Sequence, residues 1–263
     1  MRVDWSPMPG WSPSAWPRRS CVPSDRRFLA LAGRQLGHLF PRRPGQSGYH
    51  KRRRALAETI EWLMGVFGER SPGSGDPLLL IDSTPVECAR SRETLTRSAL
   101  GDAADYGYCA SHSRFFWGFR LHAIFAPDGT PRALCLTSPK RDEREVGLEL
   151  LARTRRSGGE ILLADKGYAG RAFAEGVDAL GATIVRPTRR DERGQGPHLA
   201  PIRQRIESIF WTCKDILTLE RHGARTLQGL RERVAQRFLC LAACVRLNHQ
   251  LGRPSRSLVA YVA

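Results

Sequence analysis

Apolar residues recur along this chain first with the spacing of helices and then with the spacing of strands. In residues 25–37 and again in 51–67 they return every three or four positions, which predicts two helices. Residues 1–24 are rich in Pro and Trp, with too many prolines for a helix or a central strand. We therefore expect a poorly ordered segment at 1–24, a basic helical region at 25–70, a linker at 71–77 and a larger domain at 78–263.

The larger domain begins with strands and continues with alternating helices and strands. An apolar run at 78–82 is typical of a buried strand, and residues 115–125 alternate in the manner of a long second strand. A Pro-Asp-Gly turn leads to a third strand at 132–137. The remaining elements are helices at 142–156, 171–180, 201–213 and 226–251 and strands at 160–165 and 183–186. An antiparallel meander followed by right-handed parallel crossovers predicts an α/β fold, a mixed sheet with helices on both faces.

Charge divides the chain into three parts. The formal net charge is +16 and the sequence pI is about 10.5, which is typical of proteins that bind polyanions. Residues 1–70 carry 13 basic and 5 acidic side chains, residues 71–200 carry 18 and 17, and residues 201–263 carry 11 and 4. The central part is thus nearly neutral between two basic flanks, as a carboxylate site beside phosphate-binding surfaces requires. Within the first flank, the basic run at 50–54 is either a DNA-backbone contact or a solvated surface.

Cysteine usage and hydropathy argue against several classes of protein. The seven cysteines form no C-x-x-C pair and fall mostly in apolar segments, which indicates reduced thiols and a cytoplasmic location. Cys109 and His112 are followed by no second pair at zinc-site spacing, so we expect no zinc. No run of 18 apolar residues exists, so we expect neither a membrane span nor a secretory signal.

Three acidic residues occupy positions typical of a metal site. Asp82 closes the apolar run 78–81, Asp165 closes the run 161–164, and Glu207 lies in the helix expected at 201–213. An acid at the end of a buried strand points into the crevice where open α/β sheets bind ligands. Carboxylate oxygens suit hard cations, and two Mg²⁺ ions about 3.5–4 Å apart stabilise the attacking and leaving oxygens of a phosphoryl transfer. Together with the charge, this pattern predicts an enzyme that cuts or joins nucleic acid.

Several motifs around these acids resemble those of a known family. The segments Ile81-Asp82-Ser83-Thr84-Pro85-Val86, Ala164-Asp165-Lys166-Gly167-Tyr168 and Arg203-x3-Glu207-x6-Lys214 resemble the three signatures of DDE transposases of bacterial insertion sequences. The segment 106–118, YGYCASHSRFFWG, and Glu220-Arg221-His222-Gly223 are most similar to the insertion sequence family called nine-eight-two. The resemblance covers about residues 25–263 and implies an RNase H-like catalytic domain.

The resemblance implies a DNA transposase that cleaves a strand with water and then joins it through a 3′-hydroxyl. It implies that Asp82, Asp165 and Glu207 are catalytic and hold two Mg²⁺ ions, which Mn²⁺ can replace, with Asp82 bridging both. The implied partners are the terminal inverted repeats of the element and a target duplex. A homodimer is expected on the DNA, because two ends must be cut and joined together.

Four further residues near the acids are expected to contact DNA. Arg203 precedes Glu207 by four residues and Lys214 follows it by seven, so a continuous helix would place all three on one face, where cations hold phosphate. An ordinary surface ion pair is the alternative for the arginine. Lys166 and Tyr168 follow the second aspartate in a turn, and the tyrosine either stacks on a base or packs in the core.

Two departures from the family pattern keep other functions open. The wider signature has Tyr where this chain has Ala200, and family members carry further helices before the segment that starts here at residue 25. An inactive, N-terminally truncated remnant that binds DNA is therefore one alternative. An RNase H-like nuclease acting on structured DNA or RNA is the other.

Overall fold

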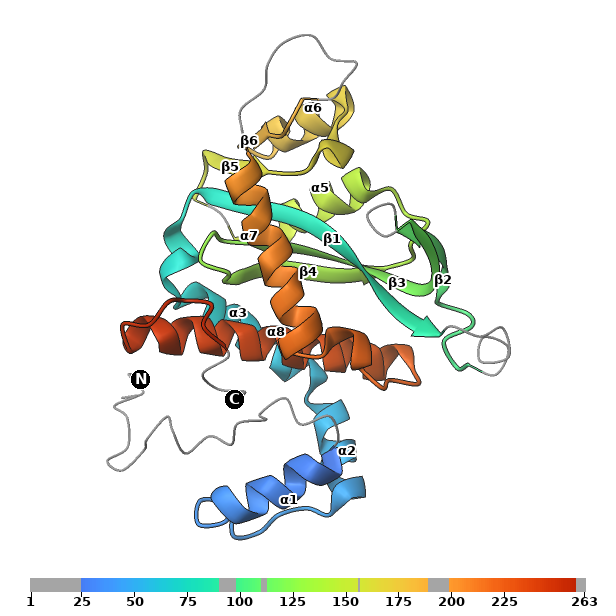
Figure 1. The fold of residues 1–263 in the computed structure, drawn as a ribbon, viewed down its shortest axis with the longest axis vertical. Coiled ribbons are helices and arrows are strands. Elements are labelled where there is room, and N and C mark those ends of the chain that lie inside the picture. Colours follow the sequence, from blue (N-terminus) through green and yellow to red (C-terminus); the bar gives the residue numbers. More distant parts are fainter. Residues whose placement is uncertain (1–24, 90–97, 110–112, 156, 189–198, 259–263) are drawn as a thin grey trace.

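A computed structural model describes residues 25–89, 98–109, 113–155, 157–188 and 199–258 of the chain. Over these ranges the protein is a mixed α/β structure in which helices cover both faces of one curled, six-stranded sheet (Figure 1). This agrees with the α/β fold expected from the order of the apolar patterns.

The sheet is antiparallel on one side of β1 and parallel on the other. Its strands are β1 (Leu78–Ala89), β2 (Asp105–Cys109), β3 (Arg114–Phe125), β4 (Pro131–Thr137), β5 (Glu160–Leu163) and β6 (Ala182–Val185). The path runs β2-β3-β1-β5-β6. β4 lies off this path and pairs with residues 120–125 of β3, after the residues of β3 that pair with β2. β3 is antiparallel to β1, β2 and β4, whereas β5 is parallel to both β1 and β6.

Two strands differ from the sequence-based expectation. β1 was expected to end at residue 82, before Pro85, but it continues to Ala89. The proline is tolerated because the pairing with β5 reaches only Leu80, so Pro85 pairs with β3 alone and its missing N–H faces no second strand. β2 was not expected at all, because its five residues contain a glycine and it pairs only with β3.

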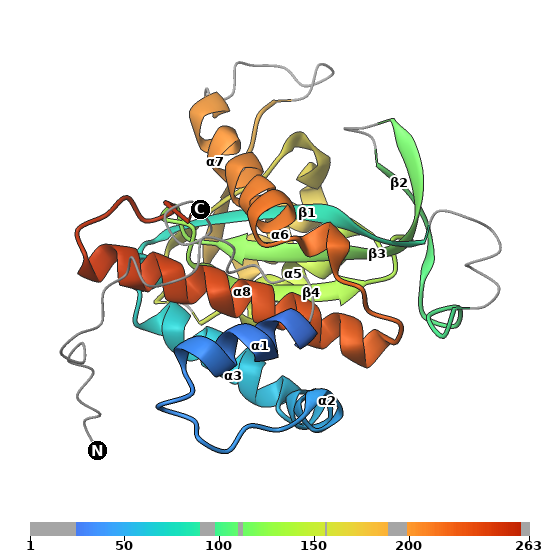
Figure 2. The same ribbon diagram turned by 60° about the horizontal axis from the view of Figure 1, so that its bottom comes forward.

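Each face of the sheet has its own core. On one face, Leu80, Val86 and Phe125 pack with α3 (Ala57–Glu69), α7 (Ala200–Trp211) and α8 (Leu227–Gln250). On the other, Leu79 and Ile81 pack with α5 (Glu143–Arg153) and α6 (Arg171–Ala179). Figure 2 shows α8 and α3 lying together beneath the sheet. Alternate residues of β1 therefore belong to different cores, as the two-residue repeat of a strand requires.

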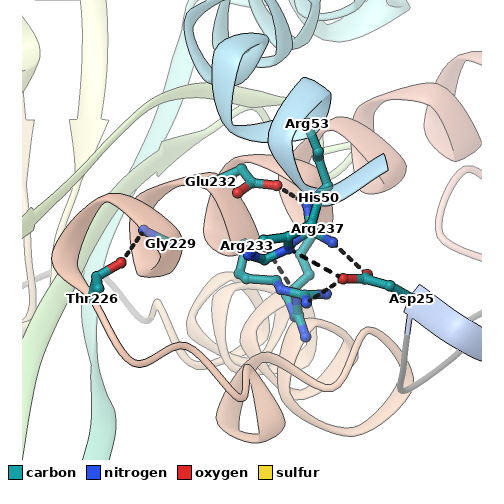
Figure 3. Close-up of polar contacts among 8 residues, drawn as sticks. All are labelled: Asp25, His50, Arg53, Thr226, Gly229, Glu232, Arg233 and Arg237. Carbon is teal, nitrogen blue, oxygen red and sulfur yellow. Dashed lines mark hydrogen bonds and ion pairs between the residues drawn. The ribbon is translucent and has the colours of Figure 1, made fainter. Parts of the chain in front are cut away.

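The N-terminal helices are attached to this domain through α8. α1 (Asp25–Gln35) and α2 (Gln46–Ala55) precede α3, so the single helix expected at 51–67 is two helices that meet at Leu56. Arg53 of α2 forms ion pairs with Asp25 of α1 and with Glu232 of α8, and the glutamate is fully buried (Figure 3). Arg233 of α8 also reaches Asp25, at 3.2 Å. The basic run at 50–54 thus turns one arginine inward and leaves Lys51, Arg52 and Arg54 exposed.

Two further expectations concern thiols and membranes. Six cysteines lie in the described ranges and none of them is in a disulfide: Cys88, Cys109, Cys135, Cys213, Cys240 and Cys244. Of the helices in the same ranges, none combines the length and the apolar character needed to cross a bilayer.

Candidate active site

The register of the sheet brings two of the candidate acids to the same level. Leu80 of β1 lies opposite Leu163 of β5 in a parallel pairing, and two residues further along each chain stand Asp82 and Asp165. Neighbouring strands lie about 4.8 Å apart. The backbone of Asp165 is still extended (φ −78°, ψ 174°) where it leaves β5, so the two aspartates are adjacent at the carboxyl side of parallel strands.

Both aspartates lie on the sheet face that α7 covers. Side chains alternate along β1, and Leu80, two residues before Asp82, belongs to the core under α7 and α8. Ala123, directly opposite Asp82 on β3, belongs to the same core, as does Leu163, two residues before Asp165. Asp82 is half-buried in this position and Asp165 is more open to solvent than the strand before it.

The third acid comes from the helix that covers this face. The buried face of α7 consists of Ile206, Ile209 and Phe210. Glu207 is exposed beside them. Within the described ranges, no three or more His, Cys, Asp or Glu side chains are grouped as a metal would require. The strand register therefore places Asp82 and Asp165 at the same level, and the three acids are not grouped as a metal site among the described residues.

Tyr168 is a core residue, which corrects the expectation that it contacts DNA. Its side chain is fully buried and its ring packs against Phe173 with centroids 5.5 Å apart. Burial, and next the charges of Asp82 and Asp165, raise the pKa of its hydroxyl well above the ordinary range. The hydroxyl has no hydrogen-bond partner among the described residues. Of the two alternatives left by the sequence, packing is therefore the one that applies in this structure.

Comparison with known proteins adds what the geometry alone does not decide. The family model described as "Transposase DDE domain" matches residues 73–243, which is more than half of the chain. The chain belongs to this family. The match spans the sheet from β1 to β6 together with α7, and it includes all three candidate acids. The described sheet is therefore the core of a DDE transposase domain.

Two further comparisons complete this result. No curated protein matches this chain. Among solved structures, it is similar to a chain of the cryo-EM structure of the piggyBac transposase synaptic complex with hairpin DNA, with 10% sequence identity and a TM-score of 0.38. That alignment covers 71% of this chain and 50% of the other, so this chain spans about half the length of that transposase chain.

A π-helical turn separates Lys214 from the face of Glu207. α7 ends at Trp211 and continues as the π-helix η5 (Thr212–Ile216), in which the Leu217 N–H donates to the Thr212 carbonyl at 3.0 Å. The seven residues from Glu207 to Lys214 therefore do not form two regular α-helical turns. Lys214 instead forms an ion pair with Glu220 at 3.3 Å. The prediction of one continuous helical face was wrong, because five-residue turns rotate later side chains relative to an α-helix.

The other two expected DNA contacts lie close to the acids in sequence. Lys166 is exposed in the 3-10 turn η4 (Lys166–Tyr168), directly after Asp165. Asp165 caps this turn, because its Oδ1 accepts the Gly167 N–H at 2.6 Å. Arg203 lies in α7, and its side chain falls outside the described part of the chain. Contact of either cation with DNA stays a prediction.

A polar cluster on the opposite face supports the strand segment next to Asp82, and sequence reasoning did not identify it. Arg120 of β3 pairs with Glu143 of α5 and donates from Nη1 to the Ser83 hydroxyl at 3.2 Å. Its Nη2 donates to the Tyr108 carbonyl of β2 at 3.0 Å. The Ser83 N–H in turn donates to Asp82 Oδ1 at 2.7 Å. One guanidinium thus joins three strands and a helix behind the first aspartate.

The sequence contains a signal for the polar cluster around Arg120. Arg120 and His122 interrupt a strand that is otherwise almost entirely buried, and a buried polar group requires hydrogen-bond partners. His122 is fully buried, with Nε2 at 3.1 Å from the Thr137 hydroxyl. Two consecutive polar positions on one face of a core strand therefore indicate a built network, although the sequence does not name the partners.

Proposed function

We propose that the DDE domain catalyses metal-dependent cleavage and strand transfer of DNA at the ends of an insertion sequence. The observation that carries this proposal is the level placement of Asp82 and Asp165 on neighbouring parallel strands, on the face covered by the helix of Glu207. The strand order, with antiparallel strands on one side of β1 and parallel strands on the other, supports an RNase H-like classification. The motifs at 106–118 and 220–223 favour the insertion sequence family nine-eight-two.

The donor atoms of the two aspartates fit a divalent metal. Both offer carboxylate oxygens at a sheet edge, and oxygen is the ligand that Mg²⁺ prefers. Asp82, Asp165 and Glu207 would hold two Mg²⁺ ions, or Mn²⁺ in their place, which supply Lewis acidity and charge neutralisation for phosphoryl transfer. Among the described residues the three acids are not grouped as a metal requires, so holding the ions would require them to come closer together. The Ser83 N–H orients the carboxylate of Asp82, and the Gly167 N–H orients that of Asp165.

The basic flanks, residues 1–70 and 201–263, are proposed to bind DNA. Lys51, Arg52 and Arg54 are exposed on α2, and the chain as a whole carries a net charge of +16. Such cations bind phosphates without reading sequence, so the affinity falls steeply with salt. The proposed substrates are double-stranded DNA with terminal inverted repeats and a target duplex. A homodimer on DNA is proposed because both ends must be joined in one event.

The decisive experiment is a cleavage and joining assay on a labelled oligonucleotide duplex that carries the element's end, in Mg²⁺ or Mn²⁺. We expect Asp82→Asn and Asp165→Asn each to lower the rate by about 1,000-fold or more, since each removes a charged oxygen ligand from transition-state stabilisation worth several kcal/mol. DNA binding should change by less than about twofold, because each variant keeps the basic flanks. Asp178→Asn, an exposed change on α6, serves as the matched control. Full activity of Asp82→Asn would sink the assignment.

The same assay separates the two alternatives. Binding of the duplex with no metal-dependent cleavage by the wild-type protein would identify the DNA-binding remnant, which Ala200 favours. Cleavage without any joined product would identify a nuclease. Removal of the metal with a chelator should stop cleavage and joining together if the transposase function holds.

A further inference from the structure

Three aromatic side chains are exposed on the ribbon formed by β2 and β3, within the motif at 106–118. Tyr106 is 54% exposed, Tyr108 48% and Phe115 77%. Tyr108 and Phe115 lie directly opposite each other in the register, with ring centroids 5.0 Å apart. We call these three residues the aromatic surface. Exposed aromatic groups in a cluster mark interaction sites more often than isolated ones do.

The aromatic surface continues the sheet face that carries Asp82. Tyr106 lies opposite Trp117, whose side chain is buried in the same core as Val86 and Phe119. Residues opposite each other in an antiparallel pair share a face, so the exposed rings extend the face on which Asp82 lies. Along β3, the level of Asp82 is six residues from Trp117 and eight from Phe115, about 20 and 27 Å, or roughly six to eight stacked nucleotides.

The ribbon behind the rings is held firmly. A Cβ at Gly107 would lie 2.7 Å from the ring of Phe116 and 2.5 Å from Pro139, so only glycine lets β2 pack this closely. Asp105 accepts hydrogen bonds from Ser138 at 2.7 Å and from Lys140 at 2.6 Å. No helix of the described residues lies over β2 in Figures 1 and 2. The rings are therefore presented to solvent on a rigid support.

The charges around the aromatic surface favour an anionic partner. The acids of this region are paired: Asp105 with Lys140 and Glu87 with Arg114, which remains 40% exposed. The His222 ring lies 3.1 Å from the Glu87 carbonyl, which places the turn η6 (Leu219–Arg221) beside β1. This turn exposes Arg221. Exposed aromatic rings with basic side chains nearby are the combination that binds unpaired nucleotides, through base stacking and phosphate contacts.

We propose that the aromatic surface stacks against unpaired DNA bases about six to eight nucleotides from the phosphate at Asp82. Tyr106 and Tyr108 are two residues apart in a strand, about 6.8 Å, which is twice the spacing of stacked bases. The substrate class is single-stranded or locally opened DNA, as arises where a duplex end is opened for cutting. The position relative to the cut phosphate rests on the proposed function, whereas binding of unpaired bases does not.

The test measures binding of a labelled 20-nucleotide single strand and of the same sequence as a duplex, without metal. The double variant Tyr108→Ser/Phe115→Ser should bind the single strand about tenfold or more weakly, and the duplex within about twofold of wild type. Tyr108→Phe keeps the ring and should bind normally. The control Trp62→Ser removes an equally exposed aromatic, 64% exposed on α3, and should change neither affinity. A 2-aminopurine base in the single strand should be quenched by wild type and not by the double variant.

Several outcomes would overturn the proposal. Equal loss of single-strand and duplex binding would show a general effect on the fold or charge, and unchanged single-strand binding would exclude base stacking. A drop in oligomeric state, with single-strand binding intact, would assign the aromatic surface to contact between copies of the chain. Because binding is measured without metal, a failure of Asp82→Asn to affect cleavage would reject the proposed function while leaving ring-dependent binding in place.

Discussion

Tyr168 packs in the core close to the candidate acids, and the burial of its hydroxyl lowers the stability of the fold. Its ring fills the core under α5 and α6, and its hydroxyl is buried without a partner among the described residues. An unsatisfied buried hydroxyl costs about 1–3 kcal/mol. Tyr168→Phe should therefore raise the free energy of unfolding by about 1 kcal/mol, measured by urea denaturation. A loss of stability would instead reveal a hydrogen-bond partner for the hydroxyl. Asp82 and Asp165 are the candidates, because their charges raise the pKa of Tyr168.

His122 makes stability depend on pH. Burial, then the charges of Arg120 and Arg141, lower its pKa to about 4, whereas an unfolded histidine titrates near 6.5. Between about pH 6.5 and 4 the unfolded state therefore binds a proton that the folded state does not. The free energy of unfolding should fall as the pH is lowered through this window, by up to about 1.4 kcal/mol per unit.

Denaturation at several pH values checks this dependence. His122→Gln keeps a hydrogen-bonding side chain but cannot titrate, so its stability should decline less steeply below pH 6.5. Some slope should remain, because burial also lowers the pKa of His222. Identical slopes for wild type and variant would contradict the assignment to His122.

At the scale of elements, one buried ion pair attaches α2 to α8. Glu232 is fully buried and Arg53 is nearly so, and removing one partner of such a pair typically costs about 3–5 kcal/mol. We expect this loss in unfolding free energy for Arg53→Met, with part of it restored in Arg53→Met/Glu232→Leu. Arg171→Met breaks an exposed pair with Glu175 and should cost no more than about 0.5 kcal/mol. Additive costs in the double variant would contradict direct coupling.

The helix of Glu207 shows where periodicity ceases to predict side-chain direction. Regular α-helical spacing was assumed from residue 201 to 214, and the buried positions Ile206, Ile209 and Phe210 agree with it. The π-helical turn that follows is not encoded by a simple repeat, so the position of Lys214 was predicted wrongly. Its ion pair with Glu220, six residues later, depends on how that turn leads into η6.

At the scale of the whole molecule, the pattern of residues predicted the alternation of strands and helices but not all pairings. Strands with a strong apolar signal, such as β3 and β5, lie close to their expected ranges. β2 was missed because its stability comes from pairing with β3, a contact with no local signal. The segment at 1–24 lies outside the described residues, so its expected disorder stays a prediction.

The sequence by itself determined the acids, their place at the ends of apolar runs, the net charge and the alternation of elements, because these depend on composition and local periodicity. Only the tertiary structure decided which strands are neighbours, and hence that Asp82 and Asp165 are level on β1 and β5. It also decided that Arg53 turns inward and that Tyr106, Tyr108 and Phe115 are exposed. Burial and register arise from long-range packing, which the spacing of residues along one chain does not specify.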